Sequence, residues 1–117
     1  MFKLLSKVLV VLCFMLAPGA WAGYSAIAYN TETGAWGEGH GASTLEKAEN
    51  IALSYCGEGC SIVTWTYNAC IALATNPLHG AGWTSARGQP TRDSAIMAAL
   101  RNCVPNLNCT LTAWACN

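Results

Sequence analysis

Six of the seven cysteines in this chain of 117 residues are the residues whose type and spacing most directly predict chemistry, and the seventh, Cys13, lies in an N-terminal segment that we expect to be removed. An even number of cysteines in a short chain favours disulfide bonds when the protein matures in an oxidising compartment. A zinc site is the alternative, but the spacings 56 to 60 and 103 to 109 match none of the tight ligand loops of zinc ribbons. We therefore expect no metal, no cofactor and three disulfides, formed by Cys56, Cys60, Cys70, Cys103, Cys109 and Cys116.

Candidate catalytic groups are few. His40 and His79 are the only histidines, and the sequence contains no Gly-x-Ser-x-Gly elbow, phosphate loop or acidic calcium loop. A serine nucleophile needs a histidine base and an orienting carboxylate, and Glu38 near His40 is a carboxylate of that kind. We interpret this pair as solvent-facing strand residues, and the sequence predicts that the protein is not an enzyme.

Aromatic residues form a candidate binding surface. Alternation in a strand puts Trp36, Glu38 and His40 on one face, with glycines on the opposite face that allow a helix to pack closely. Exposed aromatic groups of this kind mark protein interfaces, whereas the alternative is that the rings pack on one another as a minor core. The predicted binding residues are Trp36, Glu38, His40, Trp83 and Arg87.

The sequence contains an internal repeat, in which Trp36 and Trp83 occupy equivalent positions. One tryptophan and one cysteine of the first copy recur 47 positions later in the second copy. A further cysteine and tryptophan recur 49 positions later, because the loop 104–108 is two residues longer in the second copy. The matched pairs are Trp36 with Trp83, Cys56 with Cys103, Cys60 with Cys109 and Trp65 with Trp114. We therefore divide a single domain, residues 23–117, into two units, 23–68 and 69–117.

The repeat also predicts the disulfide pairing. Equivalent positions in the two units argue for local bonds, Cys56 to Cys60 and Cys103 to Cys109. Cys70 and Cys116 then remain, at the start of the first strand and the end of the last strand of the second unit. Antiparallel pairing of those strands would place them opposite one another.

Each unit is predicted to fold as strand, turn, strand, helix, strand. The first helix opens on a capping box from Ser43 to Glu46 and runs through Ala48, Ile51, Ala52 and Tyr55 at helical spacing. The predicted strands are 24–29, 35–41, 61–67, 71–75, 82–87 and 109–116, and the second helix is 92–102. The expected fold is α+β, with a mainly antiparallel sheet of about six strands, two helices on one face and two pseudo-symmetric ββαβ units stapled by disulfides. We place the third and last strands at the centre of that sheet.

The N-terminal residues 1–22 are typical of a secretory signal peptide. They contain basic residues, an apolar run that ends at Pro18, and the cleavage site Ala20-Trp21-Ala22. The apolar run is too short to span a membrane. Lipidation at Cys13 is the alternative, but the residue before it is not small. The remaining chain is expected in the periplasm or outside the cell.

The charge balance excludes some partners. Residues 23–117 contain six acidic and four basic side chains, a net charge of −2. Nucleic-acid-binding and membrane-binding domains are instead basic, so we expect neither nucleic acid nor membrane as a partner.

The sequence resembles a bacterial family known as domain of unknown function 4189. The resemblance covers nearly all of residues 23–117, and it rests on the segments 24–29, 34–37, 70–74 and 113–116 together with Cys56 and Cys60. It implies small exported proteins with no assigned catalytic residues. Some members are similar to periplasmic immunity proteins that neutralise the toxins of rival bacteria.

These observations predict a non-enzymatic exported domain that binds another protein, as an immunity protein or inhibitor of a secreted toxin would, or that self-associates through its aromatic sheet face. A secreted effector or a cell-wall-associated factor is the first alternative. A small exported hydrolase is the second.

Overall fold

The computed structural model describes residues 23–76, 83–103 and 108–117. The predicted signal peptide, residues 1–22, and His79 lie outside the described residues. No helix in the described part of the chain is long and apolar enough to cross a membrane.

The order strand, strand, helix, strand occurs twice. The first unit contains β1 (Tyr24–Tyr29), β2 (Trp36–Ala42), α2 (Leu45–Cys56) and β3 (Ser61–Tyr67). The second contains β4 (Cys70–Thr75), β5 (Trp83–Gln89), α3 (Arg92–Arg101) and β6 (Thr110–Cys116). These elements confirm the predicted strands and helices, whose ends differ by no more than two residues.

The six strands form two antiparallel sheets of three strands, in the orders β2-β1-β3 and β5-β4-β6. Even the irregularities of the strand pairing correspond. The register shifts between Ile27 and Ala28 where β1 pairs with β3, and between Leu73 and Ala74 where β4 pairs with β6. Equivalent shifts also occur at the starts of β1 and β4. The two units therefore share their bulges as well as their topology.

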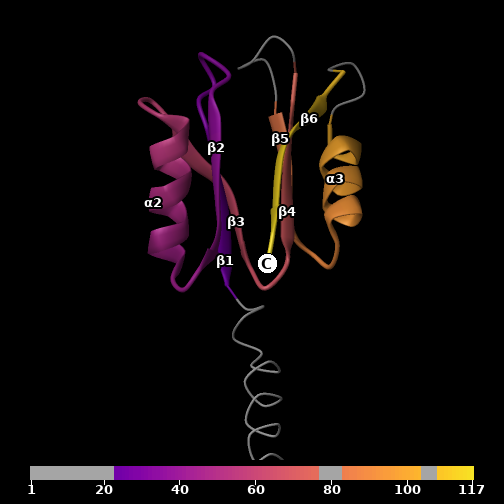
Figure 1. The fold of residues 1–117 in the computed structure, drawn as a ribbon. Coiled ribbons are helices and arrows are strands. Elements are labelled where there is room, and N and C mark those ends of the chain that lie inside the picture. The colour runs from indigo at the N-terminus through magenta and orange to yellow at the C-terminus, as the bar shows by residue number, and fades with distance from the viewer. Residues whose placement is uncertain (1–22, 77–82, 104–107) are drawn as a thin grey trace, which may run out of the picture.

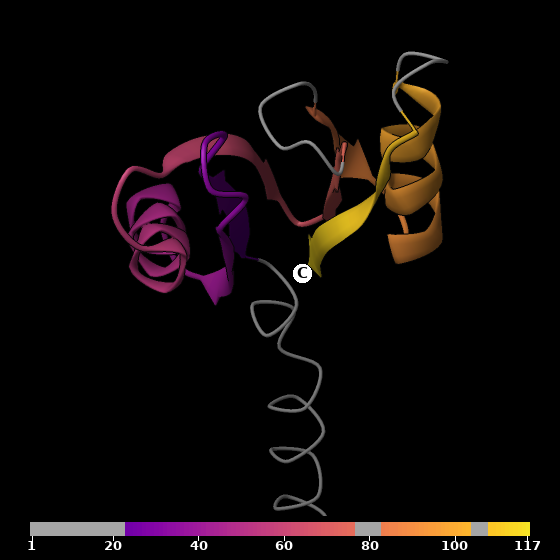
Figure 2. The same cartoon turned by 90° about the horizontal axis from the view of Figure 1, so that it is seen from above.

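The molecule has four layers. Figure 1 shows α2, the first sheet, the second sheet and α3 in succession, and Figure 2 shows from above that the two helices lie on opposite outer sides. The inner faces of the two sheets pack against each other. Their common core consists of Ile27, Tyr29, Val63, Ile71, Leu73, Ala113 and Ala115.

The α+β class, the six antiparallel strands and the two helices are confirmed. The strands divide into two sheets instead of one, and each sheet carries its own helix on its outer face. The predicted strand order is wrong, because β1 and β4 are central whereas β3 and β6 are edge strands. The physical reason is that β1 and β4 are buried on both faces, one by a helix and the other by the opposite sheet.

Glycines set the distance between α2 and its sheet. A Cβ atom at Gly37 would lie 2.4 Å from the carbonyl oxygen of Ala52, and one at Gly39 would lie 2.5 Å from that of Ala48. Both Ala48 and Ala52 are fully buried beneath the strand. The predicted close packing of a helix on the glycine face of β2 is therefore confirmed.

Each helix begins at a threonine. Thr44 caps α2, where its hydroxyl accepts from the Lys47 amide, so the predicted cap at Ser43 is wrong by one residue. Thr91 caps α3 in a complete capping box with Ser94. The buried residues of α2 are Ala48, Ala52 and Cys56, whereas Ile51 and Tyr55 are exposed.

The cysteines form the three predicted pairs. Cys56–Cys60 and Cys103–Cys109 each join the end of a helix to the start of the following strand. Cys70 and Cys116 lie directly opposite one another on β4 and β6, with their Cα atoms 4.1 Å apart. Disulfides of this number in a short chain are compatible with the predicted export.

Candidate functional site

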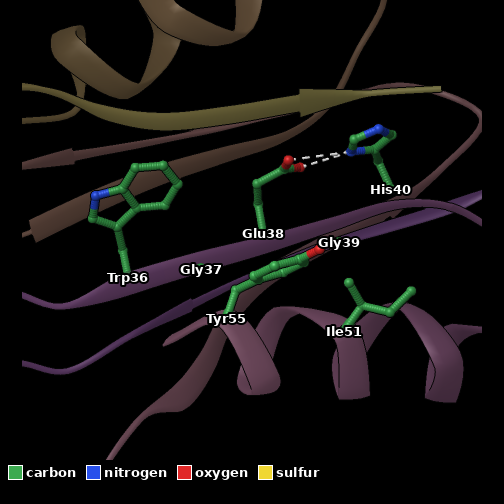
Figure 3. Close-up of a pocket in the computed structure, with 7 residues that line it drawn as sticks. All are labelled: Trp36, Gly37, Glu38, Gly39, His40, Ile51 and Tyr55. Carbon is green, nitrogen blue, oxygen red and sulfur yellow. Dashed lines mark hydrogen bonds and ion pairs between the residues drawn. The ribbon is translucent and has the colours of Figure 1, made fainter. Parts of the chain in front are cut away.

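Strand β2 presents its polar and aromatic side chains on one face. Because Gly37 and Gly39 lie against α2, the alternating residues Trp36, Glu38 and His40 point to the opposite side. Figure 3 shows these three side chains on the side of β2 away from α2. β2 is also the edge strand of its sheet, so this row of side chains borders open solvent. The structure thus brings together three of the five predicted binding residues.

Glu38 and His40 interact directly. The His40 Nδ1 atom lies 3.0 Å from one carboxylate oxygen of Glu38 and 3.2 Å from the other (Figure 3). The Glu38 side chain is mostly buried, at 26% exposure, whereas that of His40 is 61% exposed. The contact fixes the imidazole along β2, and the carboxylate retains unused acceptor capacity, since an ionised carboxylate has about four lone-pair positions.

A pocket of about 580 Å³ lies along the α2 side of this edge. Ile51 and Tyr55 form its helical wall, and residues 36–40 of β2 form the other (Figure 3). Tyr55 is 76% exposed, which is unusual for a tyrosine over an apolar pocket. The pocket therefore continues the aromatic surface from β2 onto α2.

A second pocket, of about 490 Å³, lies where β2 faces β6 of the other sheet. We call it the β2–β6 groove, and it is lined by Trp36, Glu38, His40, Thr112, Ala113, Trp114, Ala115 and Cys116. Trp36 is 44% exposed and Trp114 is 42% exposed. Two half-exposed indole rings and one carboxylate therefore share a hollow between the two units.

The remaining two predicted residues lie on the other unit, on β5. The Arg87 guanidinium carbon lies 4.3 Å from the centre of the Trp65 ring on β3, a cation–π contact between the two sheets. Trp83 opens β5 and pairs with Thr75, and its side chain lies outside the described residues. The predicted set of five therefore divides between two edges of the molecule.

Some aromatic residues pack on one another, and others are exposed. Tyr24 contacts Trp65 and Tyr67, with ring centres 6.4 Å and 4.8 Å apart. Trp36 and Trp114 are in no such ring pair within the described residues. The sequence interpretation missed Ile51 and Tyr55 as surface residues, because helical spacing alone cannot distinguish their stripe from the neighbouring stripe of small residues.

The described residues contain no group of three or more histidine, cysteine, aspartate and glutamate side chains that could hold a metal ion. All six cysteines in that part of the chain are in disulfides. The chemistry that the groove offers is therefore that of aromatic faces, one carboxylate and one imidazole.

Comparison with protein families gives a match over residues 24–116 to the model described as Domain of unknown function (DUF4189). The chain belongs to this family. The match begins with β1 and ends with β6, so the DUF4189 fold comprises both units and both pockets. No curated protein matches the sequence.

The fold is similar to that in the NMR structure of Rv1813c from Mycobacterium tuberculosis. The two chains are 29% identical, the TM-score is 0.59, and the similarity covers 81% of this chain and 75% of that chain. Most of this chain thus has a fold similar to an experimentally determined one.

Proposed function

We propose that this protein is a non-enzymatic exported domain that binds another protein through the β2–β6 groove and the adjoining Tyr55 surface. The observation that carries the proposal is the pair of half-exposed tryptophans, Trp36 and Trp114, which line the β2–β6 groove from different units. Large aromatic side chains bordering a concave surface are the residues that dominate protein interfaces.

The narrower form of the proposal is that the partner is a secreted bacterial toxin, which the protein neutralises as an immunity protein or inhibitor. This form is suggested by the family resemblance, because some members of the family are similar to periplasmic immunity proteins. The disulfides suit a protein that meets its partner in an oxidising compartment. A rigid, stapled domain also loses little conformational entropy when it blocks a target.

The experiment is a growth assay in which the chain is co-expressed with the exported product of a neighbouring toxin gene. We expect the wild-type chain to restore growth and the double variant Trp36→Ala/Trp114→Ala to fail, because each truncation of an interface tryptophan costs about 2 kcal/mol or more of binding.

Met97→Ala is the matched control, since Met97 is an exposed apolar residue on α3 that lines neither pocket. This variant should protect cells as well as the wild type does. If the double tryptophan variant also protects fully while binding the toxin with unchanged affinity, the groove is not the binding surface.

One observation favours a second candidate, a small hydrolase. The contact between His40 Nδ1 and Glu38 reproduces the base and the orienting carboxylate of a hydrolase triad. Within the described residues, however, no serine, threonine or cysteine side chain is hydrogen-bonded to His40. Hydrolysis of a bacterial cell-wall or ester substrate that disappears in His40→Ala would favour the hydrolase over the binding domain.

A further inference from the structure

The two units create two equivalent places where an edge strand of one sheet faces an edge strand of the other. β2 corresponds to β5, and β3 corresponds to β6. The β2–β6 groove therefore has a counterpart, the β3–β5 edge, at the other side of the sandwich. The two edges differ in the side chains that surround their equivalent tryptophans.

At the β3–β5 edge, a guanidinium group covers a tryptophan. Arg87 from β5 reaches across to Trp65 on β3, with 4.3 Å between the guanidinium carbon and the ring centre. A planar cation over an indole ring gains quadrupole attraction as well as contact area. This edge is closed by a side chain from the second unit.

At the β2–β6 groove, the residue equivalent to Arg87 is His40, and the residue equivalent to Trp65 is Trp114. His40 does not close the groove, because its ring contacts Glu38, which stands where the second unit has Ser85. The groove therefore retains an exposed tryptophan, and it has gained a carboxylate that its counterpart lacks.

Another guanidinium approaches Trp114 from its own unit. Arg92, in the first turn of α3, lies 5.3 Å from the ring centre and also contacts Asp93 at 3.3 Å. Its charge is thus partly balanced by a neighbouring carboxylate, whereas Glu38 on the groove side is paired, among the described residues, only with the exposed His40.

We propose that the β2–β6 groove binds an arginine side chain of the partner protein, between Trp36 and Trp114 and against the carboxylate of Glu38. The bound guanidinium would be the intermolecular counterpart of Arg87 over Trp65. A planar guanidinium suits this site because it can stack on an indole face and donate two hydrogen bonds to one carboxylate. This inference rests on the proposed protein-binding function and specifies the partner's contact residue.

The test is an NMR titration of residues 23–117 with an acetylated, amidated glycine-arginine-glycine tripeptide. We expect the indole signals of Trp36 and Trp114 to shift and that of Trp65 to remain in place. The same peptide with citrulline has the same shape without the charge, and it should bind about tenfold more weakly, which is the typical loss for a charged hydrogen bond.

Glu38→Gln should also weaken the arginine peptide about tenfold, because it removes the negative charge and keeps the side-chain shape. Glu32→Gln is the matched control, since Glu32 lies in the turn before β2 and lines neither pocket. The arginine proposal is overturned if the citrulline peptide binds equally well, if Glu38→Gln binds like the wild type, or if no groove signal shifts.

Binding of a protein partner to the same variants distinguishes failure of the arginine proposal from failure of the proposed protein-binding function. A partner that is lost in the Trp36→Ala/Trp114→Ala variant but fully retained in Glu38→Gln would leave protein binding in place and refute the arginine contact. A partner unaffected by both variants would refute both.

Discussion

Gly37 and Gly39 determine on which face of β2 side chains can lie. Backbone atoms of α2 occupy the places where Cβ atoms would stand. Every side chain larger than hydrogen in the segment 36–40 is therefore directed to the groove side of the strand. The alternation of glycine with Trp36, Glu38 and His40 thus serves the packing of the helix and the composition of the site together.

Gly37→Ala tests this packing. The added methyl group would meet the backbone of Ala52 and Cys56, which cannot move aside as a side chain can, so we expect the free energy of unfolding to fall by about 3 kcal/mol or more. Urea unfolding measures the loss. Gly88→Ala is the comparison, since Gly88 has a φ of +70° and open space around it, and its backbone strain should cost only about 1 to 2 kcal/mol. Equal losses in the two variants would contradict the close contact.

At the scale of elements, the starts of β1 and β4 are paired in different ways. Tyr24 lies opposite Tyr67, with ring centres 4.8 Å apart, where the second unit has the disulfide between Cys70 and Cys116. A noncovalent aromatic pair and a covalent bond therefore occupy equivalent strand positions. The loop-entropy model gives the covalent bond about 4 kcal/mol of stabilisation, compared with about 1 kcal/mol for an aromatic pair.

The double variant Tyr24→Cys/Tyr67→Cys should consequently form a fourth disulfide. The equivalent positions in the second unit, Cys70 and Cys116, lie directly opposite one another on β4 and β6 and already form a disulfide. In residues 23–117 of this variant we expect no free thiols after unfolding without reduction, and a gain of about 2 to 3 kcal/mol in unfolding free energy. Thiol titration and urea unfolding check both values, with Tyr24→Ser/Tyr67→Ser as the control for the lost ring contact. Two reactive thiols in the cysteine variant would refute the equivalence of the strand ends.

The elements could be predicted from the sequence because their signals are local. Period-two alternation marks β2, and the repeat supplies the second copy of every strand and helix along with the disulfide pairing. The division into two sheets depends on contacts between distant segments, which periodicity does not encode. The sequence nevertheless indicates that β1 and β4 are central strands. Both are apolar or small at nearly every position, as is typical of strands covered on both faces.

The candidate site was predictable only in part, for a related reason. Trp36, Glu38 and His40 belong to one strand, so alternation alone places them together. Trp114 joins them from the other sheet and Tyr55 joins them from α2, and both placements depend on the packing of segments that are distant in sequence. Arg87 does not belong to this group because β5 and β2 lie at different edges of the molecule, which local sequence patterns do not indicate.

At the scale of the whole molecule, Asn117 ties the second unit to the first. Its side-chain oxygen accepts from the Gly41 amide at 2.6 Å, and its side-chain nitrogen donates to the hydroxyl of the buried Ser25. Its own amide donates to the carbonyl of Ala69 in the second unit. One residue thus links β1, the end of β2 and the start of β4, beside the inter-sheet core.

Asn117→Ala should therefore lower the unfolding free energy by about 1 to 2 kcal/mol, since it leaves the buried Ser25 hydroxyl without this partner. It should also speed hydrogen exchange at the Gly41 amide, which loses its acceptor. Asn117→Asp is the informative control, because it keeps an acceptor for Gly41 and removes the donor to Ser25. Unchanged exchange at Gly41 in the alanine variant would show that the link does not hold the two units.

The pseudo-symmetry of the sandwich has one further consequence. If the two units were separate, identical chains, they would form a twofold dimer, and symmetry would force both of its edges to be the same. Both would then be closed by an arginine over a tryptophan, or both would be open beside a carboxylate. Joining the units in one polypeptide removes that constraint, so one edge can hold the sandwich together while its twin is free to acquire a different role.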